Sequence, residues 1–197
     1  MPDLHVPAPL STETVVTVNH LSRSFGAKKA LDDVSLVVRR GCVFGLVGEN
    51  GAGKSTLIKH LLGLWRAETG DVTVFGLDPV SDPVAVLGRI GYLSEEPDLP
   101  EWMRVTELFL YTQAFYPRWD AAYAEQLRQQ FGLDADARVK TLSKGQRARL
   151  GLIVAEAHRP DLLILDEPSS GLDPIVRRDI LEAIIRTIAD EGGTARS

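Results

Sequence analysis

Runs of β-branched and other apolar residues stand out along the first part of the chain. They occupy residues 14–18, 34–38, 43–47 and 72–75, and turn-forming residues separate them. Runs of this length and composition are typical of β-strands, so the pattern predicts four strands. The run 43–47 reads VFGLV and is apolar throughout, which predicts a strand covered on both faces.

A helical pattern follows the third of these runs. Residues 57–62, LIKHLL, place four apolar side chains on one side of a helix: Leu57, Ile58, Leu61 and Leu62. The glycine-rich stretch GENGAGKST lies at 48–56, between the strand and this helix. The order therefore predicts a strand, a glycine loop and an amphipathic helix.

The middle of the chain has helical patterns, and no strand pattern occurs over 105–158. Asp120 is a typical N-cap for a segment that ends at Gly132, and a second helix is expected from near Ser143 to His158. These residues predict a helical insertion.

The last patterned segment returns to a strand and a helix. The apolar run DLLILDEP at 161–168 predicts a buried strand. The helix after it is expected to have Asp173 as N-cap, Pro174 at its first position and Gly192 just past its end.

These patterns predict the domain organisation. We expect a disordered tail at 1–12 and a single α/β domain over 13–197, with a helical subdomain inserted at about 96–158. No internal repeat or low-complexity linker is present.

Composition narrows the class of protein. Hydrophobic residues make up 44% and charged residues 25% of the 197 residues, as in ordinary soluble proteins, and no apolar run has the length of a membrane span. The chain start lacks the pattern of a signal peptide, so a cytoplasmic location is expected. The net charge of −5 argues against broad nucleic-acid binding. Cys42 is the only cysteine and is expected to be a small buried residue at a strand start.

The glycine loop carries the first candidate chemistry. It matches the phosphate-binding pattern G-x-x-x-x-G-K-[ST] at Gly48, Gly53, Lys54 and Ser55, in the strand-to-helix context that this pattern requires. Glycines let the backbone curl with its amides pointing inward, and the helix start adds positive partial charge. Lys54 is expected to reach the β- and γ-phosphates of a nucleotide, and Ser55 to bind Mg²⁺.

A pair of carboxylates supplies the second half of a phosphoryl-transfer site. The apolar run LLILDE ends in Asp166 and Glu167, beside the strand of the phosphate loop if the sheet is parallel. One carboxylate is suited to the metal shell. Glu167, expected nearer the γ-phosphate, is suited to orient and activate the attacking water.

The order of a third set of motifs resembles the ABC-type ATPases. LSKGQ at 142–146, then LLILDEP, then SSGLD at 169–173 correspond to the signature, Walker B and D-loop of that family, and the resemblance covers about 14–191. It implies a P-loop NTPase core of the α/β class, with a mostly parallel sheet, an N-terminal antiparallel β part and an inserted helical subdomain.

The resemblance implies roles for residues outside the phosphate loop. Phe25 matches the aromatic residue that stacks on adenine, with a core aromatic as the alternative. Glu95 stands where the family usually has the Gln that touches Mg²⁺ and faces the membrane partner. A Glu there can still offer an oxygen to the metal but adds negative charge near the phosphates.

The signature and D-loop imply a shared site. Ser143 and Gly145 correspond to residues that contact the γ-phosphate of a nucleotide held by another protomer, and Asp173 to the aspartate that crosses the dimer interface. Lys144 departs from the usual Gly, and either adds a cation to that site or faces solvent.

The full set implied for ATP comprises Phe25, Gly48, Asn50, Gly51, Gly53, Lys54, Ser55, Thr56, Ser143, Gly145 and Gln146. The set implied for Mg²⁺ comprises Ser55, Glu95 and Asp166, and Glu167 is the catalytic candidate.

The function implied is an ATP-binding and ATP-hydrolysing subunit that powers a bacterial ABC transporter of exporter type through ATP-driven dimer closure. Its partners are an integral-membrane permease and a second nucleotide-binding subunit, in a homodimer or heterodimer, with no nucleic acid. The expected location is cytoplasmic, on the inner face of the membrane through the permease. The alternatives are a non-hydrolysing ATP-binding remnant or regulatory module, and a soluble ABC ATPase not linked to transport.

The chain departs from the family after 190, where the family continues with a strand and a switch histidine. The four histidines, His5, His20, His60 and His158, do not match that position, and each is expected to be a surface or structural residue. We therefore expect the C-terminal part of the domain to be missing, and ATP to be bound but turned over slowly.

Overall fold

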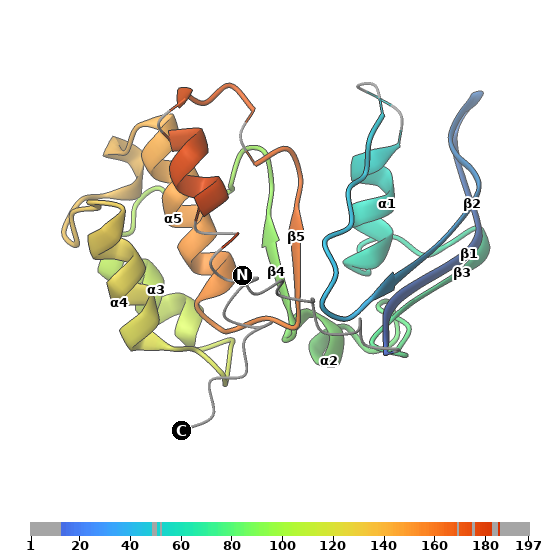
Figure 1. Ribbon diagram of the computed structural model, residues 1–197, viewed down its shortest axis with the longest axis horizontal. Helices are drawn as coiled ribbons and strands as arrows, with labels where there is room; N and C mark the ends of the chain where they lie inside the picture. The colour runs from blue at the N-terminus through green and yellow to red at the C-terminus, as the bar shows by residue number, and fades with distance from the viewer. Residues whose placement is uncertain are drawn as a thin grey trace, which may run out of the picture. The chain divides into compact units, whose positions relative to one another are not determined.

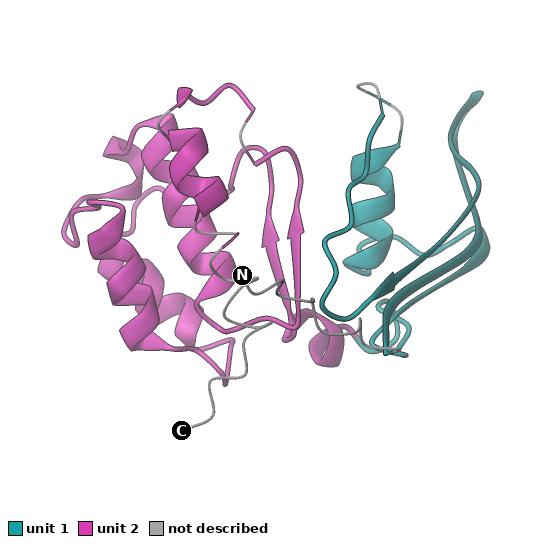
Figure 2. Cartoon of the chain, viewed as in Figure 1, with its two compact units in different colours: residues 1–82, 191–196 teal, residues 83–190, 197 magenta. Residues whose placement is uncertain are grey.

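The computed structural model describes residues 13–48, 51, 53–168, 170–174, 176–182 and 185. These residues form two compact units (Figure 2). The first unit ends at Asp82 and the second begins at Pro83.

The first unit is built on an antiparallel sheet in the order β2-β1-β3 (Figure 1). Its strands are β1 (Thr14–Phe25), β2 (Lys28–Arg39) and β3 (Thr69–Val74). Val16 in β1 is opposite Val38 on one side and Val74 on the other. The predicted strands at 14–18, 34–38 and 72–75 are thus confirmed, and β1 and β2 extend further into a long hairpin.

The helix of the first unit is α1 (Lys54–Leu61), which packs on β2 and β3. The four apolar side chains that the sequence placed on one side are buried, and the amphipathic helix is confirmed: Leu57, Ile58, Leu61 and Leu62. Together with the buried valines of the strands they form the core of this unit.

The second unit has a parallel pair of strands and a group of helices. The strands are β4 (Ile90–Leu93) and β5 (Leu162–Leu165). The helices are α2 (Pro83–Leu87), α3 (Val105–Gln113), α4 (Ala121–Gln130) and α5 (Lys144–Glu156), with a 3-10 turn η1 (Val139–Thr141). Leu150, Leu152 and Ile153 of α5 are fully buried in a core that they share with residues of β4, α3, α4 and η1.

The starts of α4 and α5 follow the predictions from sequence. Asp120 accepts a hydrogen bond from the Tyr123 amide at 2.9 Å at the start of α4. Ser143 and Gln146 form a reciprocal capping box at the start of α5. Because these caps depend only on nearby residues, the sequence was sufficient to place both helices.

The final helix is confirmed over its described part. Pro174 and residues 176–182 are helical, and Asp173 accepts a hydrogen bond from the Val176 amide at 3.1 Å, as expected of an N-cap. The predicted stop at Gly192 and the predicted tail at 1–12 lie outside the described residues.

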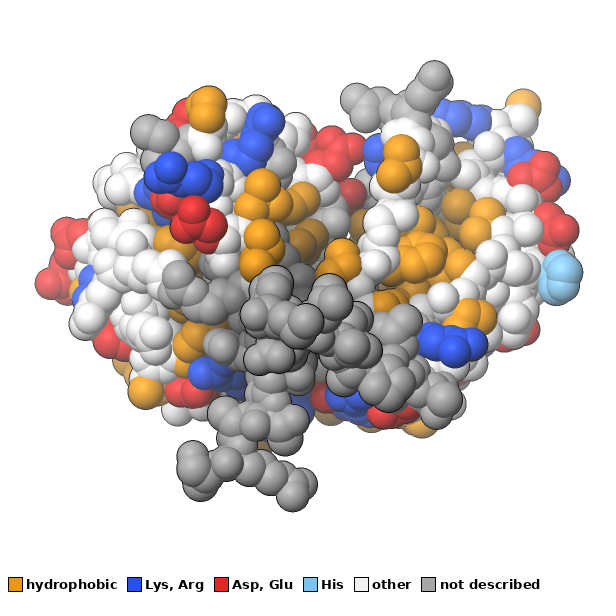
Figure 3. Space-filling view, in the orientation of Figure 1, with side chains coloured by type: hydrophobic (Ala, Val, Ile, Leu, Met, Phe, Trp, Pro, Cys, Tyr) orange, Lys and Arg blue, Asp and Glu red, His pale blue; other side chains and the backbone are white. Residues whose placement is uncertain are grey.

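Two expectations near residue 42 were wrong. Residues 43–47 are not in a strand, and Val47 is 99% exposed. Cys42 is exposed as well, and its thiol donates to the Arg39 carbonyl at 2.8 Å. An apolar run becomes a strand only where a neighbouring strand completes the hydrogen-bond ladder, and the β2-β1-β3 sheet does not extend to this run. Figure 3 shows hydrophobic side chains at the surface of the first unit.

β4 was missed by the sequence analysis. It is only four residues long and contains Gly91, which weakens a strand signal. The structure explains the glycine, because a Cβ atom at Gly91 would lie 2.2 Å from the Ala155 carbonyl oxygen in α5. The close approach of α5 to the sheet therefore requires a residue without a side chain.

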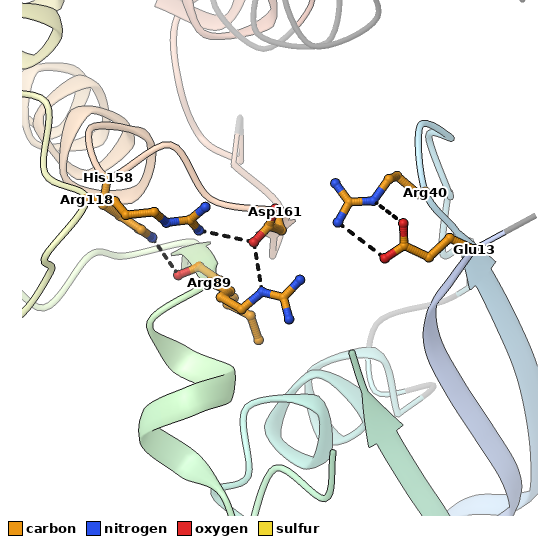
Figure 4. A network of polar contacts seen from close by, with 7 residues as sticks. Glu13, Arg40, Arg89, Arg118, His158 and Asp161 are labelled. Carbon is orange, nitrogen blue, oxygen red and sulfur yellow. Dashed lines mark hydrogen bonds and ion pairs between the residues drawn. The ribbon is translucent and has the colours of Figure 1, made fainter. Parts of the chain in front are cut away.

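A half-buried carboxylate joins the starts of β4 and β5 (Figure 4). Asp161 accepts from Arg89 at 2.8 Å and from Arg118 at 3.1 Å, and its side chain is 19% exposed. Beside it, His158 Nε2 lies 3.0 Å from the Ile90 carbonyl oxygen. Burial alone would raise the pKa of Asp161, but the hydrogen bond from Arg89 and the charges of both arginines outweigh it, so the pKa is lowered.

We predict that Asp161→Asn lowers the free energy of unfolding by about 1.5–3 kcal/mol at pH 7, because it removes charge-assisted hydrogen bonds from two arginines. The folded-state pKa of Asp161 lies below its unfolded value. Its contribution is therefore complete above the unfolded pKa and is lost as the pH falls through the folded one.

Urea unfolding of the chain from pH 7 to pH 3 tests this prediction. Glu101→Gln is the control, because Glu101 pairs with Arg147 at 3.0 Å from a 62% exposed side chain. We expect the control to cost less than about 1 kcal/mol. Equal effects of the two substitutions, or a difference that does not shrink below about pH 4, would contradict the prediction.

Candidate functional site

The phosphate loop lies in the first unit, directly before α1. Gly51 and Gly53 have φ angles of +84° and +90°, a region that favours glycine. Lys54 turns back over the loop, and its ammonium donates to the Gly48 carbonyl at 2.8 Å. The amides in the first turn of α1 have no partners within the helix, so they add positive partial charge at this end.

The loop is held by direct contact with the hairpin. A Cβ atom at Gly53 would lie only 2.2 Å from the Ala30 carbonyl oxygen of β2. The backbone of the loop therefore rests on the backbone of the strand, and only glycine fits. Glycine-rich loops with such backbone angles are typical of sites whose amides bind phosphate groups.

A second cation stands beside the loop. Lys28 Nζ lies 3.6 Å from the position that a Cβ atom would take at Gly51. The sequence analysis missed Lys28, because nothing in the pattern of a hairpin turn shows that it will face a loop more than twenty residues away. With Lys54, it places two positive charges where an anionic ligand would sit.

The other predicted residues of this loop lie close to Lys54. Ser55 is exposed in the first turn of α1, as a hydroxyl that binds a metal must be. Thr56 is half-buried, and its carbonyl oxygen lies 2.8 Å from His60 Nδ1. Asn50 lies outside the described residues.

Phe25 ends β1 and is 43% exposed. The alternative that it is a core aromatic is therefore not supported. Its ring centroid lies 5.2 Å from that of Trp65. Its contact with adenine stays a prediction.

The carboxylates predicted for metal binding and catalysis lie in the second unit. Asp166 and Glu167 follow β5 directly, and the Asp166 amide donates to the Leu93 carbonyl at the end of β4. Since β4 and β5 are parallel, Glu95 follows its strand at the same edge of the sheet.

Glu167 has unusual backbone geometry for its residue type. Its φ angle is +49°, its side chain is exposed, and its carbonyl accepts from the Ser170 amide at 3.0 Å in a turn. A non-glycine residue in this region costs free energy, and such strain is typical of functional positions.

No described group of three His, Cys, Asp or Glu side chains forms a metal cage. The candidate set of a hydroxyl and single carboxylates suits Mg²⁺, which is held by few protein ligands together with water and phosphate oxygens.

The signature residues form the start of α5. Ser143 Oγ accepts from the Gln146 amide at 3.2 Å, and Gln146 Oε1 accepts from the Ser143 amide at 2.9 Å. A Cβ atom at Gly145 would lie 2.9 Å from Val176 Cγ2, so α5 starts against the helix that Asp173 caps.

Lys144 lies against the D-loop. Its ammonium would be 2.8 Å from a Cβ atom at Gly171. It also lines a cavity of about 370 Å³ with Glu95, Glu96, Pro97, Leu142, Arg147 and Ala148. The signature and the segment after β4 thus border the same hollow in this unit.

The described histidines are surface or structural residues, as expected. His20 is exposed and lies 2.8 Å from Asp33. His60 and His158 are each 1% exposed within the cores of their units. His5 lies outside the described residues.

Comparison with known proteins identifies the class. A family model described as ABC transporter matches residues 31–170. A solved structure titled "Structure of ATP binding subunit of ABC transporter" has a TM-score of 0.81 and 32% identity, over 90% of this chain and 76% of that chain. The fold is therefore that of the P-loop nucleotide-binding proteins. The chain belongs to the ABC transporter family.

Three curated relatives show the range of similarity. Daunorubicin resistance ATP-binding protein DrrA3 of Streptomyces coeruleorubidus is 37% identical over 92% of this chain and 58% of its own length. Bacitracin transport ATP-binding protein BcrA of Bacillus licheniformis is 32% identical over 90% and 58%. Phosphonates import ATP-binding protein PhnC 1 of Natronomonas pharaonis is 34% identical over 90% and 79%. The chain thus spans about three fifths of the length of the first two. None of its described helices is both long and apolar enough for a membrane span.

We predict that Gly53→Ala destabilises the first unit by about 1–3 kcal/mol through its positive φ angle alone, and displaces the loop because of the overlap with Ala30. Nucleotide binding is expected to be lost with it. Gly26→Ala is the matched control, because Gly26 also has a positive φ angle but a Cβ atom there meets nothing within 4 Å.

Thermal unfolding and ATP titration of both variants check this. The control is expected to lose about 1–2 kcal/mol and to keep its ATP affinity. If Gly53→Ala bound ATP as well as the control does, the contact with Ala30 would not be what shapes the loop.

Proposed function

We propose that this chain binds ATP and Mg²⁺ and hydrolyses ATP as the energy-supplying subunit of a bacterial ABC transporter of exporter type. The observation that carries the proposal is the phosphate loop, with Lys54 folded over Gly48 and Gly53 resting on β2. Membership of the ABC transporter family and similarity to drug-resistance relatives support it. Within the proposed single domain over 13–197, α3, α4 and α5 lie in the proposed helical subdomain at about 96–158.

The residues of the first unit bind the nucleotide in this proposal. Loop amides, including those of Gly51, Gly53 and Thr56, donate to phosphate oxygens, and Lys54 exchanges the Gly48 carbonyl for the β- and γ-phosphates. Asn50 takes part in the same loop. Phe25 stacks on the adenine ring. Mg²⁺, held by Ser55, Glu95 and Asp166, would neutralise phosphate charge.

In this proposal, residues of the second unit carry out hydrolysis of ATP and couple it to pairing with a second subunit. Glu167 accepts the proton of the attacking water as general base. Ser143, Gly145 and Gln146 act on the nucleotide of a second nucleotide-binding subunit, in a homodimer or heterodimer. Binding of ATP then favours the closed pair, and loss of the γ-phosphate opens it.

The closing and opening drive an integral-membrane permease, which holds the subunit at the cytoplasmic face of the membrane. Two relatives are named for daunorubicin resistance and for bacitracin transport, and these names support an exporter.

We predict that Lys54→Ala weakens ATP binding by at least about tenfold, since it removes the charge that contacts the phosphates. Lys140→Ala, an exposed lysine of the second unit, is the control and is expected to have no effect. Isothermal titration with Mg-ATP measures both. Unchanged affinity of the Lys54 variant, or no affinity of the unaltered chain, would overturn the proposal.

We predict that Glu167→Gln keeps the affinity for ATP and slows hydrolysis by about 10²–10⁴-fold, because the amide cannot accept the proton. Phosphate release in single-turnover experiments measures the step. Hydrolysis that is equally fast in both proteins would mean that Glu167 is not the base. If neither protein released phosphate, the non-hydrolysing ATP-binding module would be the correct reading.

A further inference from the structure

An aromatic pair lies beside the phosphate loop. Phe25 at the end of β1 and Trp65, four residues past α1, have ring centroids 5.2 Å apart and ring planes at 59°. This tilted arrangement is one that aromatic rings favour. Because Phe25 is partly exposed, the packing of Trp65 on one side orients the ring that remains accessible.

Two cations hold this pair. The guanidinium carbon of Arg23 lies 5.2 Å from the Phe25 centroid and 5.5 Å from the Trp65 centroid, and Lys59 Nζ lies 4.6 Å from Trp65. All three distances are within the range of cation–π attraction. Arg23 is itself fixed by Glu68 at 2.9 Å, so Trp65 is held from several sides.

Trp65 also contacts the helix that begins at the phosphate loop. Its ring is edge-on to the buried ring of His60 at 5.9 Å, and His60 Nδ1 lies 2.8 Å from the Thr56 carbonyl oxygen. Trp65 therefore touches the candidate base-stacking residue on one side and the buried His60 of α1 on the other. No other described aromatic ring pairs with both Phe25 and His60.

We propose that Trp65 is a positioning residue for the base of ATP, which sets the place and tilt of the Phe25 ring relative to the phosphate loop. The inference rests on the proposed function and deepens it. A nucleotide has a fixed span between its base and its phosphates, so stacking contributes affinity only when the ring stands at the matching distance from the loop. Trp65 thus governs recognition of the base and leaves recognition of the phosphates unchanged.

The test compares two ligands, Mg-ATP and inorganic tripolyphosphate with Mg²⁺, on the full chain by titration calorimetry. Tripolyphosphate engages the phosphate loop and carries no base. We expect Trp65→Leu to weaken ATP binding by about threefold to tenfold, the equivalent of an aromatic pair, and to leave tripolyphosphate binding unchanged. Trp65→Phe keeps an aromatic ring. Its ATP affinity is expected to lie between that of the unaltered chain and that of Trp65→Leu.

A double-mutant cycle with Phe25→Leu separates action through Phe25 from independent effects. If Trp65 acts by placing Phe25, the double variant binds ATP no more weakly than Phe25→Leu alone. Trp102→Leu, which removes an exposed tryptophan of the second unit, is the control and should change neither affinity.

Three results would overturn the inference. They are unchanged ATP affinity in Trp65→Leu, equal weakening of both ligands, and losses that add in the double variant. Failure of the proposed function would give a different result, because the unaltered chain would then bind neither ligand. The inference about Trp65 would fail in that case as well.

Discussion

The contact of the Gly53 backbone with the Ala30 carbonyl is the constraint on which the first unit depends. It fixes the phosphate loop on the hairpin, so the residues at the hairpin turn are held at a set place relative to the loop. Lys28 stands beside Gly51 for this reason, and Phe25 lies within reach of Trp65. A side chain at position 53 would push the loop away from the hairpin. The contacts of Lys28 and Phe25 that depend on this packing would then be lost.

In the second unit, parallel strand pairing holds the candidate residues in place. Asp161 and its two arginines hold the starts of β4 and β5, and the Asp166 amide bonded to Leu93 holds their ends. With both ends fixed, the residues after each strand emerge at one edge. The parallel register of β4 and β5 places Glu95 and Asp166 at the same edge of the sheet, although neither residue is part of the paired segment.

How much could be predicted from the sequence depends on whether the cause is local. The amphipathic helix after the glycine loop, the Asp120 cap and the helix start near Ser143 are set by residues close in the chain, and they were predicted correctly. The fold class followed from the order of such motifs. β4 was missed because its four residues form a strand only through β5 and α5. The run 43–47 and Cys42 were misjudged because apolar character alone does not supply a pairing partner.

The candidate site also has features set by residues close in the chain and features set by residues that only the fold brings together. Recognition of phosphate needs backbone amides and a lysine in one short stretch, so a sequence pattern captures it. The proposed recognition of the base needs a flat ring at a fixed distance from that stretch, and the candidate ring, Phe25, ends β1. Phe25 packs against Trp65 and Arg23, and the spacing of these residues in the chain follows no period or motif. Contacts of this second kind can be found only where the fold brings residues together, so the family resemblance pointed to Phe25 but nothing in the sequence pointed to Trp65 or Arg23.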